Sequence, residues 1–432
     1  MTIQDMAKAA KSASVLLAAQ KTQRKNAALK QIAEALLTHK EAIIQANQQD
    51  FDKAQVNELA APLLKRLKFD SAKIEDVCQG IESLIQLKDP SGQTLSTTEL
   101  DENLELYRVT CPIGVIGVIF ESRPDALVQI STLCLKSGNA VMLKGGSEAA
   151  CTNRILTKII NQASLEVGIP AGWIQLLETR EDVADILGLD DVIDLIIPRG
   201  SNEFVKYIMD NTNIAVLGHA DGICHVFVEN EANLDMAVRI AVDSKCQYVA
   251  VCNAAETLLV DRDIAATFLP RVQAALSEKG TEIRGCAETC KLIKAIPAQD
   301  QDWSTEYLDM ILSIKIVDGL QEAINFVNQY GSGHTDCIVT QNKEKAAFFM
   351  DLVDAGNVFW NCSTRFSDGF RYGLGAEVGI STNKIHARGP VGLEGLVIYK
   401  WKMIGNGQTV TDYCGNHAKP FTHKDMNKDC PL

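Results

Sequence analysis

The sequence predicts an α/β fold with two tandem α/β domains, each with a parallel-rich sheet, and a small additional β element. Three observations lead to this prediction. Residues 1–95 carry apolar side chains at spacings of three and four, which is the period of a helix. From about residue 105, short β-rich runs alternate with helical stretches, a pattern typical of a parallel sheet covered by helices. A second series of the same kind begins near residue 224.

The first series follows the N-terminal helices, in which breaks are expected at residues 70–71 and 89–92. A proline at the first helical position, Pro124, opens one helix, and Gly138 closes it. Ser147, followed by Glu148, is expected to cap the next helix, which ends at residues 168–170. Strands are predicted at residues 104–109, 114–120, 140–145, 173–177, 192–197 and 213–217.

The second series predicts strands at residues 224–228, 256–260, 311–317, 336–340 and 357–360. Two segments have no obvious place in either sheet: a hairpin at residues 94–110 and a strand-like run at residues 395–404. Because exposed strand edges invite pairing with another chain, these segments predict an oligomerisation element. The tail from about residue 412 is polar and is expected to be mobile.

Composition excludes several functional classes. The chain has 432 residues and a net charge of −13, which argues against electrostatic binding to nucleic acid or to anionic membranes. No apolar run approaches the roughly 18–20 residues that a membrane helix needs. The 13 cysteines are odd in number and irregularly spaced, as in a reduced protein of the cytoplasm rather than in a disulfide scaffold. The sequence therefore predicts a cytoplasmic enzyme.

Two strand–turn–helix junctions are candidate phosphate sites. Lys144 ends one predicted strand and Ser147 follows it, while Gly200 and Ser201 follow another and precede a helix. The positive end of a helix dipole attracts phosphate, so a dinucleotide is one interpretation. Ordinary punctuation between a strand and a helix is the alternative, and from the residues alone both stay open. The glycines at 373, 375 and 379 lack the strand and helix that a dinucleotide fingerprint requires.

Cys252 is the cysteine in the most distinctive setting. It lies between the apolar residues 248–251 and the polar Asn253, in a loop before a predicted strand. Such a loop can present a thiol for nucleophilic chemistry, whereas a buried core thiol is the plainer alternative. The tail also contains four residues with metal-binding side chains, but their spacing matches no common zinc module, and no metal site is predicted there: Cys414, His417, His423 and Cys430.

Three strings bring a family resemblance. VCNAAETLLV (251–260), YGSGHTDCIVT (330–340) and the long run at 363–401, which begins STRFSDGFRYGLG, resemble those of the gamma-glutamyl phosphate reductase family. The resemblance implies an aldehyde dehydrogenase-like fold. It assigns residues 1–93 and 111–223 to a nucleotide-binding domain, 224–392 to a catalytic domain, and 94–110 with 393–405 to an oligomerisation flap. Residues 412–432 form the polar tail beyond the likeness.

The resemblance also implies roles at the cofactor site. Lys144 resembles the lysine that reaches the adenosine ribose, and Gly200 with Ser201 resembles the Gly-Ser pair at the pyrophosphate helix. Glu306 resembles the glutamate that holds the nicotinamide ribose, although the usual Phe-Gly-Pro after it is replaced by residues 308–310, Leu-Asp-Met. Ser147 stands where NAD-selective relatives tend to place a carboxylate, so we expect NADPH and NADP⁺ as the cofactor pair.

At the reaction centre, Cys252 matches the family's nucleophile, with Asn253 beside it, and Ser122 stands where the superfamily has an oxyanion-hole asparagine. His219 aligns with the glutamate base of hydrolytic members, and its plainer interpretation is a turn residue with a satisfied hydrogen bond. Candidate substrate residues are Arg123 and Arg365, because a guanidinium binds phosphate or carboxylate bidentately, although structural ion pairs would use them as well.

The implied activity is NADPH-dependent reduction of L-glutamyl 5-phosphate to L-glutamate 5-semialdehyde with release of phosphate, in proline biosynthesis. A homo-oligomer, dimer or tetramer, is expected, and transient contact with glutamate 5-kinase is the partner that a labile acyl phosphate suggests. Two alternatives remain. One is an aldehyde dehydrogenase of other specificity that acts oxidatively with water, and the other is a non-catalytic binding protein of the same fold.

Overall fold

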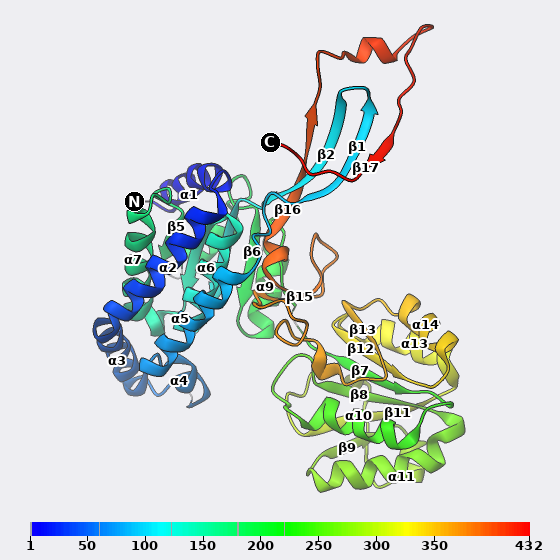
Figure 1. Ribbon diagram of the computed structural model, residues 1–432. Coiled ribbons are helices and arrows are strands. Elements are labelled where there is room, and N and C mark those ends of the chain that lie inside the picture. Colours follow the sequence, from blue (N-terminus) through cyan, green and yellow to red (C-terminus); the bar gives the residue numbers. More distant parts are fainter. Residues whose placement is uncertain (1, 60, 122, 179–180, 220) are drawn as a thin grey trace. The chain divides into compact units, whose positions relative to one another are not determined.

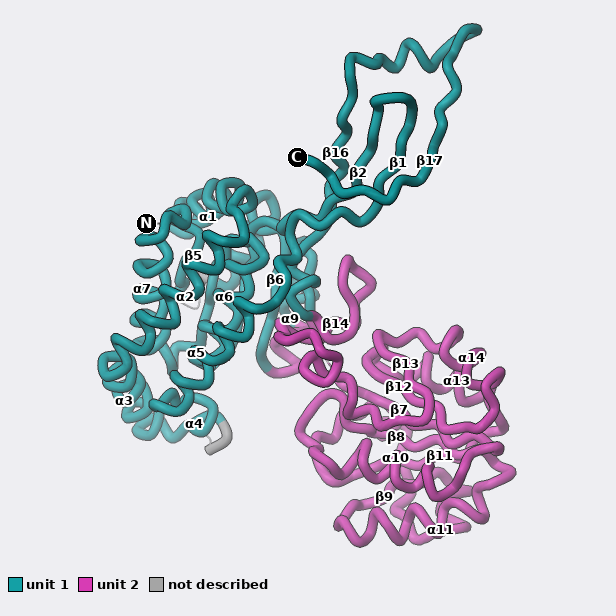
Figure 2. Tube along the Cα trace, in the orientation of Figure 1, with its two compact units in different colours: residues 1–200, 207–217, 392–432 teal, residues 201–206, 218–391 magenta. Residues whose placement is uncertain are grey.

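The computed structural model describes residues 2–59, 61–121, 123–178, 181–219 and 221–432, in two compact units (Figures 1 and 2). Unit 1 comprises residues 1–200, 207–217 and 392–432, and unit 2 comprises residues 201–206 and 218–391. Within these described ranges, no helix combines the length and the apolar character that crossing a membrane requires.

Unit 1 begins with five helices, as the helical period predicted. The Asp70 carboxylate accepts the backbone N–H of Lys73 and so starts the last of them, which confirms the predicted break at residues 70–71. The first helix starts with a capping box between Thr2 and Asp5. The five helices are α1 (Ile3–Ala18), α2 (Thr22–Thr38), α3 (Lys40–Val56), α4 (Ala61–Leu67) and α5 (Ser71–Gln86).

A four-stranded parallel sheet forms the centre of unit 1, in the order β5-β4-β3-β6. Every residue of β3 and β4 is buried, because helices cover both faces of the sheet. Pro124 opens α6, and Gly138 ends it in the left-handed conformation, as predicted. The elements are β3 (Val115–Phe120), α6 (Pro124–Ser137), β4 (Ala140–Gly145), α7 (Ala150–Glu166), β5 (Ile174–Leu177), α8 (Glu181–Leu187), β6 (Leu195–Arg199) and α9 (Asn202–Asp210).

The strand predicted at residues 213–217 is wrong. This segment joins the sheet through a single bridge between Val216 and Ile196 of β6. The Ile196 backbone donates to Ala215 and accepts from Leu217, so one residue of β6 makes all the ladder contacts. Ile214, Val216 and Leu217 are buried without a longer ladder, and β-propensity alone does not report how many partner residues are available.

Unit 2 has a seven-stranded, fully parallel sheet in the order β10-β9-β11-β8-β7-β12-β13. The five strands predicted for the second series are all present, and β9 and β10 are additional. The strands are β7 (Cys224–Val228), β8 (Ala255–Asp261), β9 (Glu282–Gly285), β10 (Ile296–Pro297), β11 (Ile311–Val317), β12 (Thr335–Val339) and β13 (Asn357–Trp360). The helices are α10 (Leu234–Cys246), α11 (Arg262–Glu278), α12 (Thr289–Leu292), α13 (Gly319–Tyr330) and α14 (Lys343–Leu352).

Alternate residues of the central strands of unit 2 enter two separate apolar cores. Val226 and Leu258 pack with Phe268 of α11, whereas their neighbours Phe227 and Leu259 enter the core that contains Phe349 of α14. Because side chains of a strand alternate between faces, the two cores lie on opposite faces of the sheet. Unit 2 is therefore a three-layer α/β/α structure, which leaves the strand ends as the places for chemistry. A two-stranded sheet of β14 (Gly379–Ser381) and β15 (Gly389–Val391) completes it.

The two segments without a place in either α/β sheet pair with each other. The predicted hairpin consists of β1 (Thr94–Asp101) and β2 (Leu104–Pro112), with Asn103 left-handed at the turn, and β16 (Val397–Ile404) pairs along β2 over its whole length. A fourth strand, β17 (Lys424–Met426), pairs with β1. Figure 1 shows these four strands side by side as an antiparallel sheet separate from the parallel ones.

The tail is ordered on this sheet, so its predicted mobility is wrong. Besides the β1–β17 pairing, Thr97 Oγ1 donates to the Lys428 carbonyl at 2.7 Å, and the Cys430 backbone N–H donates to Thr94 Oγ1 at 2.9 Å. The physical reason is that β1 would otherwise be an edge strand with unpaired backbone groups, which the tail satisfies.

Candidate functional site

The candidate reaction centre of unit 2 lies where three neighbouring parallel strands begin. Cys252 is in the loop between α10 and β8, as the sequence predicted, Gly222 precedes β7, and His334 precedes β12. The strands are adjacent in the order β8-β7-β12, and parallel strands have their amino ends at the same edge. Three segments distant in sequence therefore meet around the thiol.

Two imidazoles accompany the half-buried Cys252 thiol. The Cys252 sulfur and one ring nitrogen each of His219 and His334 all lie within 4.8 Å of one another. The two rings meet edge to face, with their centroids 5.1 Å apart. The cluster thus offers one nucleophilic sulfur and two proton acceptors. Its position in the protein agrees with the predicted role of Cys252, which stays a prediction until it is tested.

Each imidazole is held through its Nδ1 atom. His219 Nδ1 lies 3.1 Å from the Ile380 carbonyl oxygen, and because a carbonyl only accepts, this nitrogen carries the proton. His334 Nδ1 lies 2.8 Å from Thr335 Oγ1. The His334 ring is fully buried, which holds its pKa well below the usual range, with a further contribution from His219. His334 is therefore neutral at physiological pH.

The loop that carries Cys252 is fixed by its neighbour Asn253. The buried Asn253 amide donates to the Ser367 carbonyl at 2.7 Å, and the Asn253 carbonyl accepts from Thr364 Oγ1 at 2.7 Å. Both partners belong to residues 363–367, which follow β13. Asn253 thus holds the loop against this segment, and its role as an oxyanion donor stays a prediction.

Gly222 lets the chain pass directly over the Cys252 backbone. A Cβ atom at position 222 would lie 2.2 Å from the Cys252 carbonyl oxygen and 2.4 Å from its Cα. Real Cβ contacts are essentially never this short, so only glycine fits here. The packing of the segment before β7 against Cys252 therefore sets where the thiol is presented.

The two predicted substrate arginines differ in environment. Arg365 lies in a short 3₁₀ turn after β13, is buried, and donates from Nε to Gln247 Oε1 at 2.9 Å. Burial and the nearby Arg371 lower its pKa, whereas the Cys252 thiol interacts with it favourably. Arg365 is therefore a cation in the surroundings of Cys252. Arg123, in unit 1, is exposed at the start of α6, and Ser122 lies outside the described residues.

Lys144 ends β4 as predicted, and the turn after it differs from the prediction. Its side chain is buried, and Nζ donates to the Gly145 carbonyl at 2.6 Å. Ser147 is exposed and begins a 3₁₀ turn of three residues, so α7 starts at Ala150 and Ser147 does not cap it. The Glu148 carboxylate folds back over Gly146, where a Cβ would lie 2.0 Å from Glu148 Oε1.

The start of α7 already binds a carboxylate, which disfavours one of the two predicted phosphate sites without testing it. Asp50 of α3 accepts the backbone N–H groups of Cys151 and Thr152 at 3.0 and 2.7 Å. A second anion there would meet the Asp50 charge, and the donors are already used. Any cofactor phosphate near Lys144 must therefore rely on side chains and not on this helix terminus.

The second junction has the predicted strand–turn–helix form. Gly200 follows β6, and the Ser201 carbonyl accepts from Val205 at 2.9 Å as the first helical hydrogen bond of α9. The exposed Ser201 hydroxyl also lies 3.4 Å from the Phe204 backbone nitrogen, which donates to it. This arrangement is that of a serine N-cap.

Glu306 lies in the loop between the 3₁₀ turn at residues 300–304 and β11. Its Oε2 accepts from the Asn202 amide at 2.5 Å, and the same amide donates to Asp221 at 3.0 Å. Burial raises the pKa of Glu306, and the Asn202 hydrogen bond opposes the rise. A carboxylate held in this way can accept hydrogen bonds from the hydroxyl groups of a ribose.

These residues fit a nicotinamide dinucleotide in their chemistry. The buried Lys144 ammonium and the exposed Ser147 hydroxyl supply donors for an adenosine ribose, and the Ser201-capped start of α9 supplies N–H groups for a pyrophosphate. Glu306 supplies an acceptor for the second ribose. Unit 1 thus contains groups suited to the adenosine ribose, and unit 2 contains groups suited to a pyrophosphate and to a second ribose.

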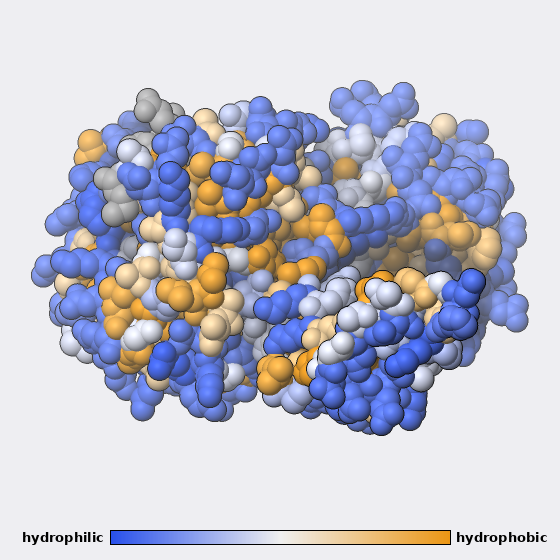
Figure 3. Space-filling view, turned by 90° about the horizontal axis from the view of Figure 1, so that it is seen from above, coloured by the Kyte–Doolittle hydropathy of each residue, from blue (hydrophilic) through white to orange (hydrophobic). Residues whose placement is uncertain are grey.

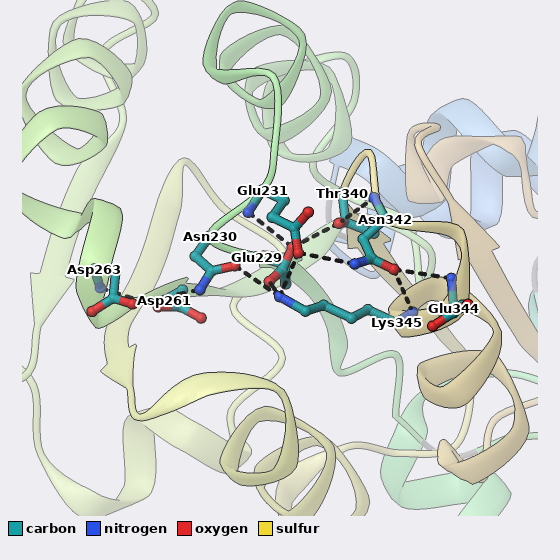
Figure 4. A network of polar contacts seen from close by, with 9 residues as sticks. All are labelled: Glu229, Asn230, Glu231, Asp261, Asp263, Thr340, Asn342, Glu344 and Lys345. Carbon is teal, nitrogen blue, oxygen red and sulfur yellow. Dashed lines mark hydrogen bonds and ion pairs between the residues drawn. The ribbon is translucent and has the colours of Figure 1, made fainter.

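The opposite, carboxyl edge of the unit 2 sheet holds a polar network of a different kind (Figure 4). Glu229 follows β7, is buried, and pairs with Lys345 of α14, while its other oxygen accepts from Thr340 at 2.6 Å. Lys345 also pairs with Glu231 at 2.8 Å, and Asn342 caps α14. Lys345 thus pairs with two carboxylates that follow β7, so this edge ties α14 to the strands.

Sequence reasoning missed two residues of the reaction centre, Gly222 and His334. Gly222 had no signal, because its requirement depends on the Cys252 backbone 30 positions later. His334 lies in the string YGSGHTDCIVT, and a histidine directly before a buried strand was the available signal. It gains meaning only once β12 is known to lie next to β7.

Comparisons with known proteins agree with this geometry. The model of the aldehyde dehydrogenase family matches residues 1–285 and 279–375. A protein of Acetivibrio thermocellus described as gamma-glutamyl phosphate reductase is 65% identical over all of both chains. One of Methanococcoides burtonii with the same description is 54% identical and covers 97% of this chain and 96% of its own. The crystal structure of gamma-glutamyl phosphate reductase from Thermotoga maritima is 39% identical, has a TM-score of 0.92, and covers 94% of this chain and 99% of its own.

Proposed function

The chain belongs to the gamma-glutamyl phosphate reductase family, a branch of the aldehyde dehydrogenase family, and on this premise we propose that it reduces L-glutamyl 5-phosphate to L-glutamate 5-semialdehyde with NADPH, releasing phosphate. This is the reductive step of proline biosynthesis. The observation that carries the proposal is the Cys252 thiol beside two imidazoles, in a chain that is alignable end to end with reductases of this description.

Cys252 begins the reaction. Its thiolate attacks the acyl carbon of glutamyl phosphate, the carbon–oxygen bond to phosphate breaks, and inorganic phosphate leaves with the bonding electrons, so that a thioester remains on the protein. One ring nitrogen each of His219 and His334 lies within 4.8 Å of the sulfur, so these two imidazoles are the available proton acceptors. Because His219 is protonated on Nδ1, its Nε2 carries the lone pair that can take the thiol proton.

When bound, NADPH would supply the hydride for reduction of the thioester. The oxyanion formed at the same carbon requires hydrogen-bond donors, for which we propose the Cys252 backbone N–H with Asn253. One such donor is typically worth about 3–4 kcal/mol. When the oxyanion collapses, the carbon–sulfur bond breaks, the aldehyde leaves, and Cys252 returns as the thiolate. Arg365, a buried cation that interacts with the thiol, favours both the thiolate and an anionic substrate.

The thioester must survive until hydride arrives. An aldehyde dehydrogenase that works oxidatively with water needs a base to activate that water, and a carboxylate is suited to this task. Among the described residues, the groups that cluster with the sulfur are imidazoles and include no carboxylate. We therefore assign reduction to this chain, with hydrolysis as the disfavoured alternative.

The residues after β4 support a preference for NADPH over NADH. Position 147 holds a small exposed hydroxyl instead of a carboxylate that would repel a 2′-phosphate, and Lys144 ends the strand. Glu148 supplies a carboxylate one residue later, and it is directed back over Gly146. Selectivity therefore depends on side chains of this turn.

The antiparallel sheet is proposed as the surface through which copies of the chain associate. β16 is an edge strand with four large exposed apolar side chains: Ile398, Tyr399, Trp401 and Met403. An edge strand with a long apolar surface favours pairing with another chain. The face seen in Figure 3 is largely hydrophilic, with apolar side chains gathered in patches. The exposed apolar side chains of the β16 edge are consistent with a homo-oligomer.

The proposed chemistry is tested by trapping the acyl enzyme. The protein is mixed with glutamate 5-semialdehyde and NADP⁺ without phosphate, quenched with acid and digested. We expect a single equivalent of NADPH per chain and an acyl group on the Cys252 peptide, found by mass spectrometry. The C252S variant is the matched control and should give neither. Continued turnover without phosphate would instead support the oxidative, water-using alternative.

A further inference from the structure

The His219, Cys252 and His334 cluster has a property that acyl transfer does not require. The three side chains come from separate segments, and each offers a soft or borderline ligand atom within 4.8 Å of the others. Among the residues that the structure describes, this is the one group of three or more potential metal-binding side chains gathered so closely. Two imidazoles and a thiolate are ligands that Zn²⁺ prefers.

The orientation of both imidazoles is that of metal ligands. A histidine that binds metal through one nitrogen generally donates from the other to an oxygen, which fixes the ring and its tautomer. His219 Nδ1 lies 3.1 Å from the Ile380 carbonyl, and His334 Nδ1 lies 2.8 Å from Thr335 Oγ1. In His219, Nε2 is then the nitrogen with the lone pair, and the same holds for His334 when its Nδ1 donates to the Thr335 hydroxyl.

His334 adds an independent observation. It is fully buried, and its Nε2 has no hydrogen-bond partner in the described part of the chain. A buried polar atom without a partner is destabilising and rare, so it needs an explanation. A bound metal ion is one such explanation, because it would be the partner of the His334 Nε2 atom.

We propose that His219, Cys252 and His334 form a Zn²⁺ site that reversibly inhibits the enzyme. Zinc with sulfur at about 2.3 Å and nitrogen at about 2.0–2.1 Å has ligand atoms roughly 3.3–3.8 Å apart. Atoms now within 4.8 Å must therefore approach by about 1.5 Å at most, a movement that side-chain rotation provides. Binding releases the thiol proton, and water or an anion takes the fourth position.

The predicted inhibition rests on the proposed function, in which the Cys252 thiolate attacks the acyl phosphate. A thiolate bound to zinc cannot make this attack. Zn²⁺ should inhibit reduction, and a chelator should restore it. Zinc binding can be measured without the reaction. A failure to bind zinc would therefore not reject the proposed reductase activity, and a lack of that activity would not reject the metal site. The tail residue His417 supplies a matched control, because it belongs to the other Cys/His-containing segment and lies in unit 1, outside the cluster.

The experiment measures Zn²⁺ binding to the full chain by competition with a chromogenic chelator, and the rate of Cys252 alkylation by iodoacetamide with and without Zn²⁺. We expect one Zn²⁺ per chain and protection of Cys252 from alkylation. H334Q should weaken binding at least tenfold, and H417Q should leave binding and activity unchanged. Equal affinity in H334Q, or loss of binding in H417Q, would overturn the proposal.

A second readout does not depend on the folding of H334Q. Co²⁺ is added to the wild-type protein in place of Zn²⁺, and the absorption spectrum is recorded. Thiolate coordination gives a sulfur-to-cobalt charge-transfer band, which should be present in the wild type and absent in C252A. A wild-type spectrum without that band would show that the thiol does not bind metal and would reject the site. NADP⁺ reduction measured on metal-free samples reports the proposed function separately.

Discussion

Replacing Gly222 with alanine is the sharpest test of how the thiol is positioned. The new Cβ would lie 2.2, 2.4 and 2.6 Å from the carbonyl oxygen, Cα and carbonyl carbon of Cys252. All three are backbone atoms, so no side chain can rotate away to relieve the contact. To reach even 3.0 Å, the shortest separation that real Cβ atoms show, the Cys252 backbone or the residue 222 segment must move by roughly 0.8 Å.

A displacement of this size should be expensive for catalysis. Misplacement of a reacting group by about 1 Å costs on the order of 10²-fold in rate, equivalent to about 2.7 kcal/mol of activation free energy. Overpacking also lowers the free energy of unfolding by about 1–3 kcal/mol. We therefore expect G222A to remain folded, with a lower Tm, a kcat reduced about a hundredfold and a nearly unchanged affinity for NADPH.

The assay is the phosphate-dependent reduction of NADP⁺ with glutamate 5-semialdehyde, together with NADPH fluorescence titration and circular dichroism. The matched control is G80A in α5, where a Cβ meets no atom within 4 Å. That variant should retain full activity and gain up to about 1 kcal/mol of stability, because alanine favours helix. A folded G222A with kcat within threefold of wild type would refute the argument that residue 222 sets the thiol position.

Four further predictions follow from the same structure. C252A should abolish turnover while leaving NADPH binding and Tm intact, which activity and fluorescence titration measure. S147E should lower kcat/KM for NADPH at least tenfold while sparing NADH, and an unchanged ratio would place selectivity elsewhere. W401E on the exposed edge strand should reduce the oligomeric state seen by light scattering, and a strictly monomeric wild type would contradict this. His334 has a lowered pKa in the folded protein, so the unfolded state binds more protons below about pH 6.5, and stability falls as the pH falls through that range. In chemical denaturation, H334Q should therefore show a flatter dependence of the unfolding free energy on pH in this range. A curve identical to that of the wild type would contradict this prediction.

The strands of the two parallel sheets could be predicted because their apolar runs are continuous and bounded by turns. β4, β7, β11 and β13 have the predicted bounds, and β4 and β7 are buried throughout, as expected for strands between helices. β9 was not predicted, because it has only four residues and two of them carry charged side chains. The segment at residues 213–217 was overpredicted, since its composition suits a strand but the sheet offers it one pairing position.

The features that could not be predicted depend on contacts between residues far apart in the sequence. The start of α7 depends on Asp50, which lies 101 positions before Cys151 and is invisible to any local helix rule. The tail is ordered by β1, more than 300 residues earlier in the chain. At the reaction centre, Cys252 could be found from its loop and from the family resemblance. His334 and Gly222 could not, because their roles arise from the strand order β8-β7-β12.

The most direct test of the central claim is the dependence of NADP⁺ reduction on inorganic phosphate, with purified protein and glutamate 5-semialdehyde. If Cys252 forms a thioester that only phosphate removes efficiently, the steady-state rate should rise from near zero to saturation as phosphate is added, and C252A should show no rate at any concentration. A wild-type rate independent of phosphate would mean that water takes the acyl group, and the assignment as an acyl-phosphate reductase would be wrong.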